Sequence, residues 1–187
     1  MNFLIVLTIT SVLSACSSLL PAGRQETITP WHSFEEAKAA YETIETYRTT
    51  REDLHALGYD PGKTANVTIL NQSQVVKTVV PQPSLSIEEQ PQGIRDCIRG
   101  EDKCIGYALE QSRLNRKRIG NFFLDFMNFD RETSITGWRF SALIIIVDGI
   151  VVYKQWSGQP LIHQFERNRN PLGPLQGAGD SRSLIKF

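Results

Sequence analysis

The chain has 187 residues and a formal net charge of +0 at pH 7, from 20 basic and 20 acidic residues. This length is sufficient for one domain with a substantial core. A neutral chain has no overall field that attracts nucleic acid, so we expect no nucleic-acid partner.

The N-terminus has the pattern of a bacterial lipoprotein signal. Residues 3–12 (FLIVLTITSV) are almost all apolar, in a run too short to cross a bilayer. Residues 13–16 (LSAC) follow directly and resemble a lipobox. This resemblance implies that residues 1–15 are a signal peptide and that Cys16 becomes the lipidated first residue. A buried N-terminal strand or helix with an incidental cysteine is the alternative.

The residues after Cys16 bear on location. Position 17 is serine, and bacterial lipoproteins without aspartate at this position usually reach the outer membrane. The resemblance therefore implies an outer-membrane lipid anchor, with the domain facing the periplasm. Residues 16–32 are small and polar, contain two prolines and show no periodicity, which is typical of a flexible tether.

Two capping patterns predict a pair of helices. Ser33 followed by Glu36 predicts the start of a helix over residues 34–47. Thr50 followed by Asp53 predicts a second helix over residues 51–57, which Gly58 ends. Apolar residues recur at helical spacing in the first segment, so we expect a helical hairpin with one buried face.

Two further cysteines lie close together at Cys97 and Cys104. Outside the cytoplasm such a pair usually forms a disulfide, and we expect this pairing. A redox or metal-binding pair is the alternative, although the spacing is not CxxC and no histidine is near in sequence. The preceding residues 81–93 contain three prolines and predict an irregular segment.

The second half of the chain predicts antiparallel strands. Asp148-Gly149 separates two apolar, β-branched runs at residues 138–147 and 150–156, which is a strong hairpin signal. Both faces of this hairpin are apolar near the turn, so each needs a covering layer. Residues 105–114 are compatible with strand or helix, and the aromatic residues of 122–129 favour a buried strand.

These elements predict an α+β fold in which an N-terminal helical hairpin packs on a small antiparallel sheet. Residues 33–165 are expected to form a single domain. Residues 166–187 are rich in Asn, Arg, Gly, Pro and Ser and predict a disordered tail.

No catalytic motif is present in the sequence. The three histidines, His32, His55 and His163, have no neighbour at metal-ligand spacing. Carboxylates at Asp125, Asp130 and Glu132 are close enough in sequence for acid–base chemistry, but we interpret them as part of a polar loop. We therefore expect no enzyme activity, no cofactor and no metal.

Aromatic and basic residues suggest a surface for a protein partner. Exposed tryptophans at the ends of the hairpin would anchor a partner, and the basic run RLNRKR would contact acidic partners or anionic lipid headgroups. A buried position for the tryptophans and a solvated position for the basic run are the alternatives. The predicted partner-binding residues are Trp138, Arg139, Trp156, Arg116, Lys117 and Arg118.

Residues 50–61 (TREDLHALGYDP) and the hairpin of residues 140–151 resemble the SmpA/OmlA (BamE-like) outer-membrane lipoproteins. The resemblance implies a binding or scaffolding module in outer-membrane protein assembly or envelope integrity, with an envelope protein as partner. A lipoprotein subunit of a secretion or export machine and a lipid-anchored hydrolase are the alternatives.

Overall fold

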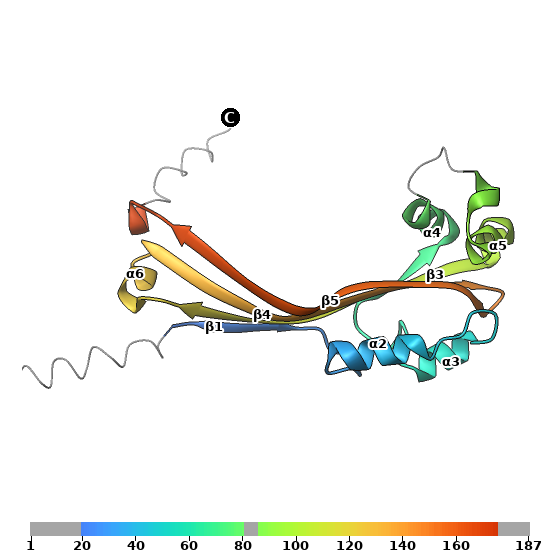
Figure 1. The fold of residues 1–187 in the computed structure, drawn as a ribbon, viewed down its shortest axis with the longest axis horizontal. Helices are drawn as coiled ribbons and strands as arrows, with labels where there is room; N and C mark the ends of the chain where they lie inside the picture. The colour runs from blue at the N-terminus through green and yellow to red at the C-terminus, as the bar shows by residue number, and fades with distance from the viewer. Residues whose placement is uncertain (1–19, 81–85, 176–187) are drawn as a thin grey trace, which may run out of the picture. The chain divides into compact units, whose positions relative to one another are not determined.

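A computed structural model describes residues 20–80 and 86–175 (Figure 1). The predicted signal peptide, Cys16, and residues 176–187 of the predicted tail lie outside the described residues. Short 3-10 turns occur at Ile87–Glu89 and Glu101–Lys103. The main elements are β1 (Ala22–Glu26), α2 (Phe34–Glu42), α3 (Arg51–Ala56), β2 (Val67–Asn71), α4 (Gln72–Val79), α5 (Gln92–Gly100), β3 (Cys104–Ile119), α6 (Phe122–Phe126), β4 (Asp130–Val147) and β5 (Ile150–Arg169).

The predicted fold class is wrong, because a large antiparallel sheet of five strands dominates the structure. The strand order is β1-β3-β4-β5, and β2 also pairs with β3. In that pair Val67 lies opposite Leu109 and Asn71 opposite Ile105, in antiparallel register. Strands β3, β4 and β5 have 16, 18 and 20 residues, far longer than the small sheet that the sequence predicted.

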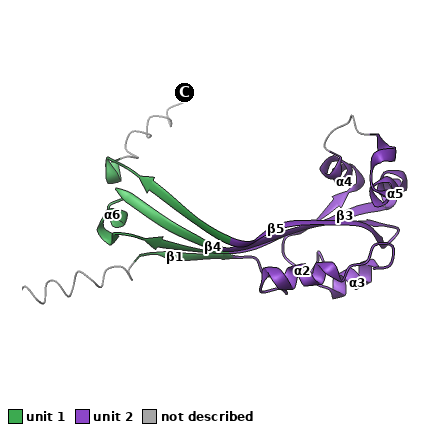
Figure 2. Ribbon diagram, in the orientation of Figure 1, with its two compact units in different colours: residues 1–25, 114–136, 162–187 green, residues 26–113, 137–161 purple. Residues whose placement is uncertain are grey.

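The chain forms two compact units rather than the single domain predicted for residues 33–165 (Figure 2). Unit 1 contains residues 1–25, 114–136 and 162–187, and unit 2 contains residues 26–113 and 137–161. The long strands β3, β4 and β5 each contribute one segment to each unit.

Both predicted helices of unit 2 form, with the predicted N-caps. The Ser33 side chain accepts a hydrogen bond from the Glu36 amide, and Thr50 and Asp53 form a reciprocal capping box. Gly58 has a φ of +97°, as a residue that ends a helix in the left-handed conformation requires. The first helix ends at Glu42 rather than at residue 47.

The sheet of unit 2 is covered on both faces, as its two apolar faces predicted. In Figure 1, α2 and α3 lie on one side of the strands, and α4 and α5 on the other. Under α2 and α3, Ala37, Tyr41 and Leu54 pack with Phe140 and Ile144 in one core. Under α4 and α5 a second core contains Val75, Ile94, Cys97, Leu143, Ile145 and Val152.

The predicted hairpin is confirmed, with Asp148 and Gly149 both at positive φ (50° and 82°). Such a pair of angles is the mark of a two-residue turn whose twist matches that of the strands. Beyond it, Val151 and Lys154 both contact the α2 side, so the alternation of β5 is shifted by one residue between them. Strict alternation from the turn would put Tyr153 on the face of Val151 and Trp156 on the face of Val152, and the shift places each on the other face.

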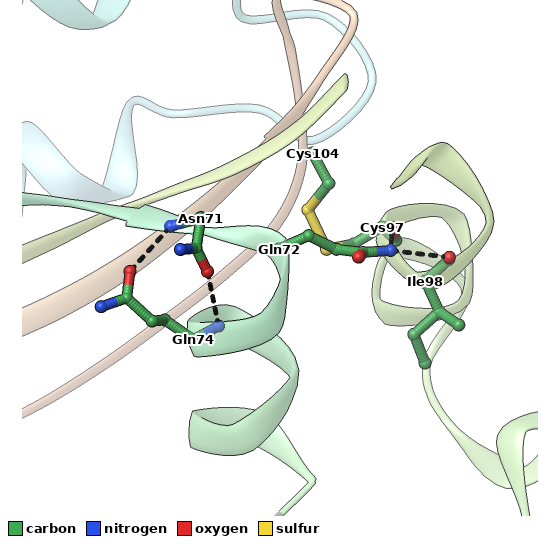
Figure 3. Close-up of a disulfide and its surroundings, with 6 residues drawn as sticks. All are labelled: Asn71, Gln72, Gln74, Cys97, Ile98 and Cys104. Carbon is green, nitrogen blue, oxygen red and sulfur yellow. Dashed lines mark hydrogen bonds between the residues drawn. A yellow bond between two sulfur atoms is a disulfide. The ribbon is translucent and has the colours of Figure 1, made fainter. Parts of the chain in front are cut away.

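Cys97 and Cys104 form the predicted disulfide, with Cα atoms 5.0 Å apart (Figure 3). It joins α5 to the first residue of β3, and both cysteines are buried in the second core. Gln72, the first residue of α4, donates through Nε2 to the carbonyls of Cys97 and Ile98, at 3.3 and 2.9 Å. These bonds satisfy carbonyl groups near the end of α5 that lack helical partners.

Unit 1 corrects three further predictions. Residues 22–26, predicted as tether, form β1, and β5 extends to Arg169, well into the predicted tail. Residues 122–126, predicted as part of a buried strand, form the short helix α6 instead. Asn121 starts this helix, because its side chain accepts hydrogen bonds from the amides of Phe123 and Leu124.

Candidate functional site

An open trough lies on the sheet of unit 2, on the face that α4 and α5 cover only in part. Its volume is about 380 Å³. Ala108 and Leu143, which also contact the second core, give it an apolar floor. The remaining lining residues are Leu109, Glu110, Ser141, Ala142, Gln155, Trp156 and Ser157.

Strand alternation explains why this face changes from apolar to polar. Along β4, Ile145 and Leu143 are buried in the second core, and Ser141 and Arg139 follow at the next two alternate positions. Arg139 is exposed, so a cation extends the row beyond the trough. Beyond the covering helices the sheet thus presents hydroxyl, amide, carboxylate and guanidinium groups.

The trough has the chemistry of a binding surface. Ser141, Ser157 and Gln155 supply hydrogen-bond donors and acceptors, and Glu110 supplies an exposed carboxylate. None of the histidines lines it, so its serines have no imidazole base beside them. An open, partly apolar hollow lined by these groups can form both apolar contacts and hydrogen bonds with a bound group.

The structure does not bring the predicted partner-binding residues into one surface. Trp138 is 9 % exposed and packs in the first core, so it is not an exposed anchor. Trp156 is 42 % exposed, and its ring stacks 5.9 Å from that of Phe140. Lys38 lies over the Trp156 ring at 5.3 Å. Arg139 lies on the opposite face of the sheet from Trp138, because the two are adjacent in β4.

Arg116, Lys117 and Arg118 belong to unit 1, whereas the two tryptophans belong to unit 2. Arg116 and Lys117 are exposed at the end of β3, and within the described part of the chain neither has an ion-pair partner. Arg118 instead donates to the Asp125 carboxylate at 2.8 Å. The basic run is thus divided between two exposed cations and one cation with a structural partner.

The carboxylate of Asp125 fixes α6 to the sheet of unit 1. Asp125 is 2 % exposed, and Arg131 approaches the same oxygen as Arg118, at 3.6 Å. The three carboxylates that the sequence placed together therefore pair with different arginines. Asp125 pairs with Arg118 and Arg131, whereas Asp130 and Glu132 both pair with Arg167. Hydrogen bonds from Arg167 lower the pKa of Asp130, as expected for a carboxylate with a structural partner.

Burial also shifts the pKa of one residue on α2 and one on β5. Burial, then the nearby Tyr153, raises the pKa of Tyr41 to about 12. Burial lowers the pKa of Lys154, whose Nζ donates to the Tyr41 carbonyl at 3.0 Å and lies 4.4 Å from the Tyr41 ring centre. Both residues help to hold α2 against β5 and lie outside the trough.

The sequence analysis missed the trough and the exposed side chains of α6. The polar residues Arg139 and Ser141 at alternate positions of the segment were a signal for the trough, but the apolar run that follows dominated the interpretation. In α6, Phe123 is 65 % and Phe126 70 % exposed. The Asn121 cap was the local signal that these phenylalanines lie on a short helix rather than in a buried strand.

The chain matches no protein-family model, no curated protein and no solved structure. Of the helices in residues 20–80 and 86–175, none is both long and apolar enough to cross a membrane. The same residues contain no group of three or more His, Cys, Asp or Glu side chains placed to hold a metal ion.

Proposed function

We propose that this protein is a lipid-anchored lipoprotein of the bacterial envelope that acts by binding another envelope component, without catalysis of its own. The observation that carries the proposal is the LSAC sequence ending at Cys16, directly after a short apolar segment. We propose that the anchor lies in the outer membrane and that the domain faces the periplasm, because the residue after the cysteine is Ser17 rather than aspartate.

The disulfide supports a location outside the cytoplasm. Cys97 and Cys104 are bonded, and the bond lies in the core between α5 and β3. Disulfides of this structural kind persist in oxidising compartments such as the periplasm. A disulfide that closes so short a loop contributes roughly 2.5 kcal/mol of stability in the chain-entropy model.

The trough on unit 2 is the surface that we propose for the partner. A tether to the membrane raises the local concentration of the domain beside any membrane component, so a small interface suffices. Arg139, one of the residues predicted from sequence, extends the row of polar side chains from Ser141. The resemblance of residues 50–61 to SmpA/OmlA lipoproteins suggests outer-membrane protein assembly as the setting.

Replacement of Cys16 by serine is expected to release the protein from the membrane. Acyl chains contribute about 0.8 kcal/mol per buried methylene, and a serine hydroxyl does not take the thioether-linked lipid. The measurement is incorporation of a labelled fatty acid, together with membrane fractionation after an alkaline carbonate wash. Wild-type protein should carry label and remain in the pellet, whereas Cys16→Ser should lose both properties.

A matched control for this experiment is the double variant Cys97→Ser/Cys104→Ser. It removes the other two cysteines, and with them the disulfide, but leaves the lipobox intact, so it should still incorporate the fatty acid. If Cys16→Ser remains labelled and carbonate-resistant, the lipoprotein proposal is wrong.

Reversal of charge in the trough is expected to weaken partner binding at least about tenfold, because the partner group that complements the Glu110 carboxylate would then face a like charge. Glu110→Arg makes this change at an exposed trough residue. Glu88→Arg, at an exposed site outside the trough, is the matched control. The measurement is the yield of a cross-linked envelope partner from intact cells, with folding confirmed by circular dichroism.

Equal yields from wild type, Glu110→Arg and Glu88→Arg would exclude the trough as the partner surface. Turnover of an envelope substrate by the purified protein, abolished by one polar substitution, would replace the binding proposal with an enzymatic one.

A further inference from the structure

Exposed aromatic side chains are concentrated on α6 of unit 1. Phe123 and Phe126 are 65 % and 70 % exposed, and Leu124 between them is 41 % exposed. We call these three residues the α6 patch. The rings of Phe122 and Phe126 stack at 5.9 Å, which holds the aromatic side of this short helix together. Exposed apolar groups at such density mark a contact surface rather than ordinary solvent-facing residues.

A buried ion pair on the opposite side of α6 attaches the helix that carries the α6 patch to the sheet. Asp125 is buried and pairs with Arg118 of β3 at 2.8 Å. Its backbone amide also donates to the Asn121 carbonyl at 3.1 Å. Asp125 faces the sheet, so Phe123 and Phe126 project away from it, into solvent. The Asp125 ion pair holds the helix in place, although unit 1 has only a small apolar core. The buried core of unit 1 consists of Leu114, Ile135 and Ile162.

Unit 1 is also the basic part of a chain whose formal net charge is +0. Among its described residues it has seven basic side chains and four acidic ones, which gives a net charge of +3. The basic residues are Arg24, Arg116, Lys117, Arg118, Arg131, Arg167 and Arg169, and the acidic ones are Asp125, Asp130, Glu132 and Glu166. The described residues of unit 2 have fifteen acidic and eleven basic side chains, a net charge of −4.

The N-terminal end of the described chain lies beside α6. Leu20 and Pro21 line a hollow of about 290 Å³ together with Phe122 and Phe126. The Arg118 amide donates to the Pro21 carbonyl at 3.2 Å, which fixes this end of the chain to β3. Cys16 precedes Leu20 by four residues, and a chain of this length spans at most roughly 14 Å.

We propose that the α6 patch inserts into the surface of the bilayer to which Cys16 is anchored, and that the exposed Arg116 and Lys117 near the end of β3 in the same unit bind its anionic lipid headgroups. This inference rests on the proposed lipidation of Cys16, because the short span to Leu20 then holds α6 at the headgroup layer. Interfacial helices bury their apolar side by about 5–10 Å, a depth comparable with that span. The two exposed cations match anionic headgroups in charge.

The test measures vesicle binding without the acyl anchor. The chain from residue 16 onward, with Cys16→Ser, is sedimented with vesicles of phosphatidylethanolamine and phosphatidylglycerol, and with vesicles of phosphatidylcholine alone. We expect binding to the first kind, reduced at least about tenfold by Phe123→Ser/Phe126→Ser, because this variant removes two aromatic rings that would be buried among the lipid chains. Arg116→Gln/Lys117→Gln should cost about fivefold per cation, on the anionic vesicles alone.

The matched controls lie in unit 2. Ile28→Ser/Ile69→Ser removes two exposed apolar side chains, and Lys63→Gln/Lys77→Gln removes two exposed cations. Both should bind vesicles as well as the parent protein. Failure of the parent protein to bind, or full binding by Phe123→Ser/Phe126→Ser, would overturn the inference. Because no acyl chain is present, this result is independent of the lipidation experiment on Cys16.

A second measurement reports where the α6 patch lies. An environment-sensitive fluorophore on Phe126→Cys should shift to the blue when anionic vesicles are added, whereas the same fluorophore on Ile28→Cys should not. A blue-shifted spectrum at Phe126→Cys before vesicles are added would show that protein, from this chain or a second copy, already covers the patch. That outcome also overturns membrane insertion.

Discussion

Replacement of Phe140 by alanine is expected to lower the free energy of unfolding by about 3–5 kcal/mol, the usual cost of removing a buried aromatic ring. Phe140 is completely buried, in the middle of β4. Its ring contacts those of Phe34, Tyr41 and Trp156, at centroid distances of 5.7, 6.2 and 5.9 Å. The substitution therefore leaves a cavity between the sheet and α2.

The measurement is thermal unfolding followed by circular dichroism, in which the loss corresponds to a fall in Tm on the order of 10 °C. Phe123→Ala is the matched control, because it removes the same ring from an exposed position. This control should change the free energy of unfolding by less than about 0.5 kcal/mol. An equal loss in both variants would mean that Phe140 does not hold α2 on the sheet.

Features encoded by neighbouring residues were predictable from sequence. The caps at Ser33 and Thr50 and the turn at Asp148-Gly149 each complete their hydrogen bonds or backbone angles within a few residues. Their signals depend on local chemistry and need no knowledge of the sheet. The disulfide was predictable for a similar reason, because Cys97 and Cys104 are close in the chain.

The size of the sheet was not predictable in the same way. Residues 22–26 (AGRQE) and the end of β5 are polar and have little strand propensity of their own. They form strands because neighbouring strands supply hydrogen-bond partners, as when Thr27 donates to the carbonyl of Ser112 far along the chain. The residue pattern of one segment does not indicate which distant strand will pair with it, so these strands could not be predicted from the sequence.

The face on which Trp156 lies has a similar non-local cause. Strict alternation from the Asp148-Gly149 turn puts Trp156 on the side of Leu143, but the ring packs against Phe34 and Phe140. The shift arises between Val151 and Lys154, at the place where α5 packs on the backbone of β5. The shift and the docking of α5 thus lie at the same place, and the shift puts the Trp156 ring on the α2 side of the sheet.

That docking depends on Gly93, and replacement of Gly93 by alanine is expected to cost about 3 kcal/mol of stability. A Cβ at this position would lie 2.0 Å from the carbonyl oxygen and 2.6 Å from the carbonyl carbon of Val152. Both atoms belong to the backbone of a paired strand, so they do not move aside as the end of a side chain does. The helix α5 has to shift, and with it Ile94 and Cys97 of the second core.

The sign of the effect separates this packing from simple helix propensity. Alanine is about 1 kcal/mol better than glycine inside a helix, so Gly93→Ala would raise Tm if only propensity mattered. We expect Tm to fall, and amide hydrogen exchange to rise in α5 while α2 remains protected, because the contact is confined to the second core. Gly23→Ala is the matched control, since a Cβ there has no atom within 4 Å. A higher Tm for Gly93→Ala, with unchanged exchange in α5, would show that α5 does not rest on the β5 backbone.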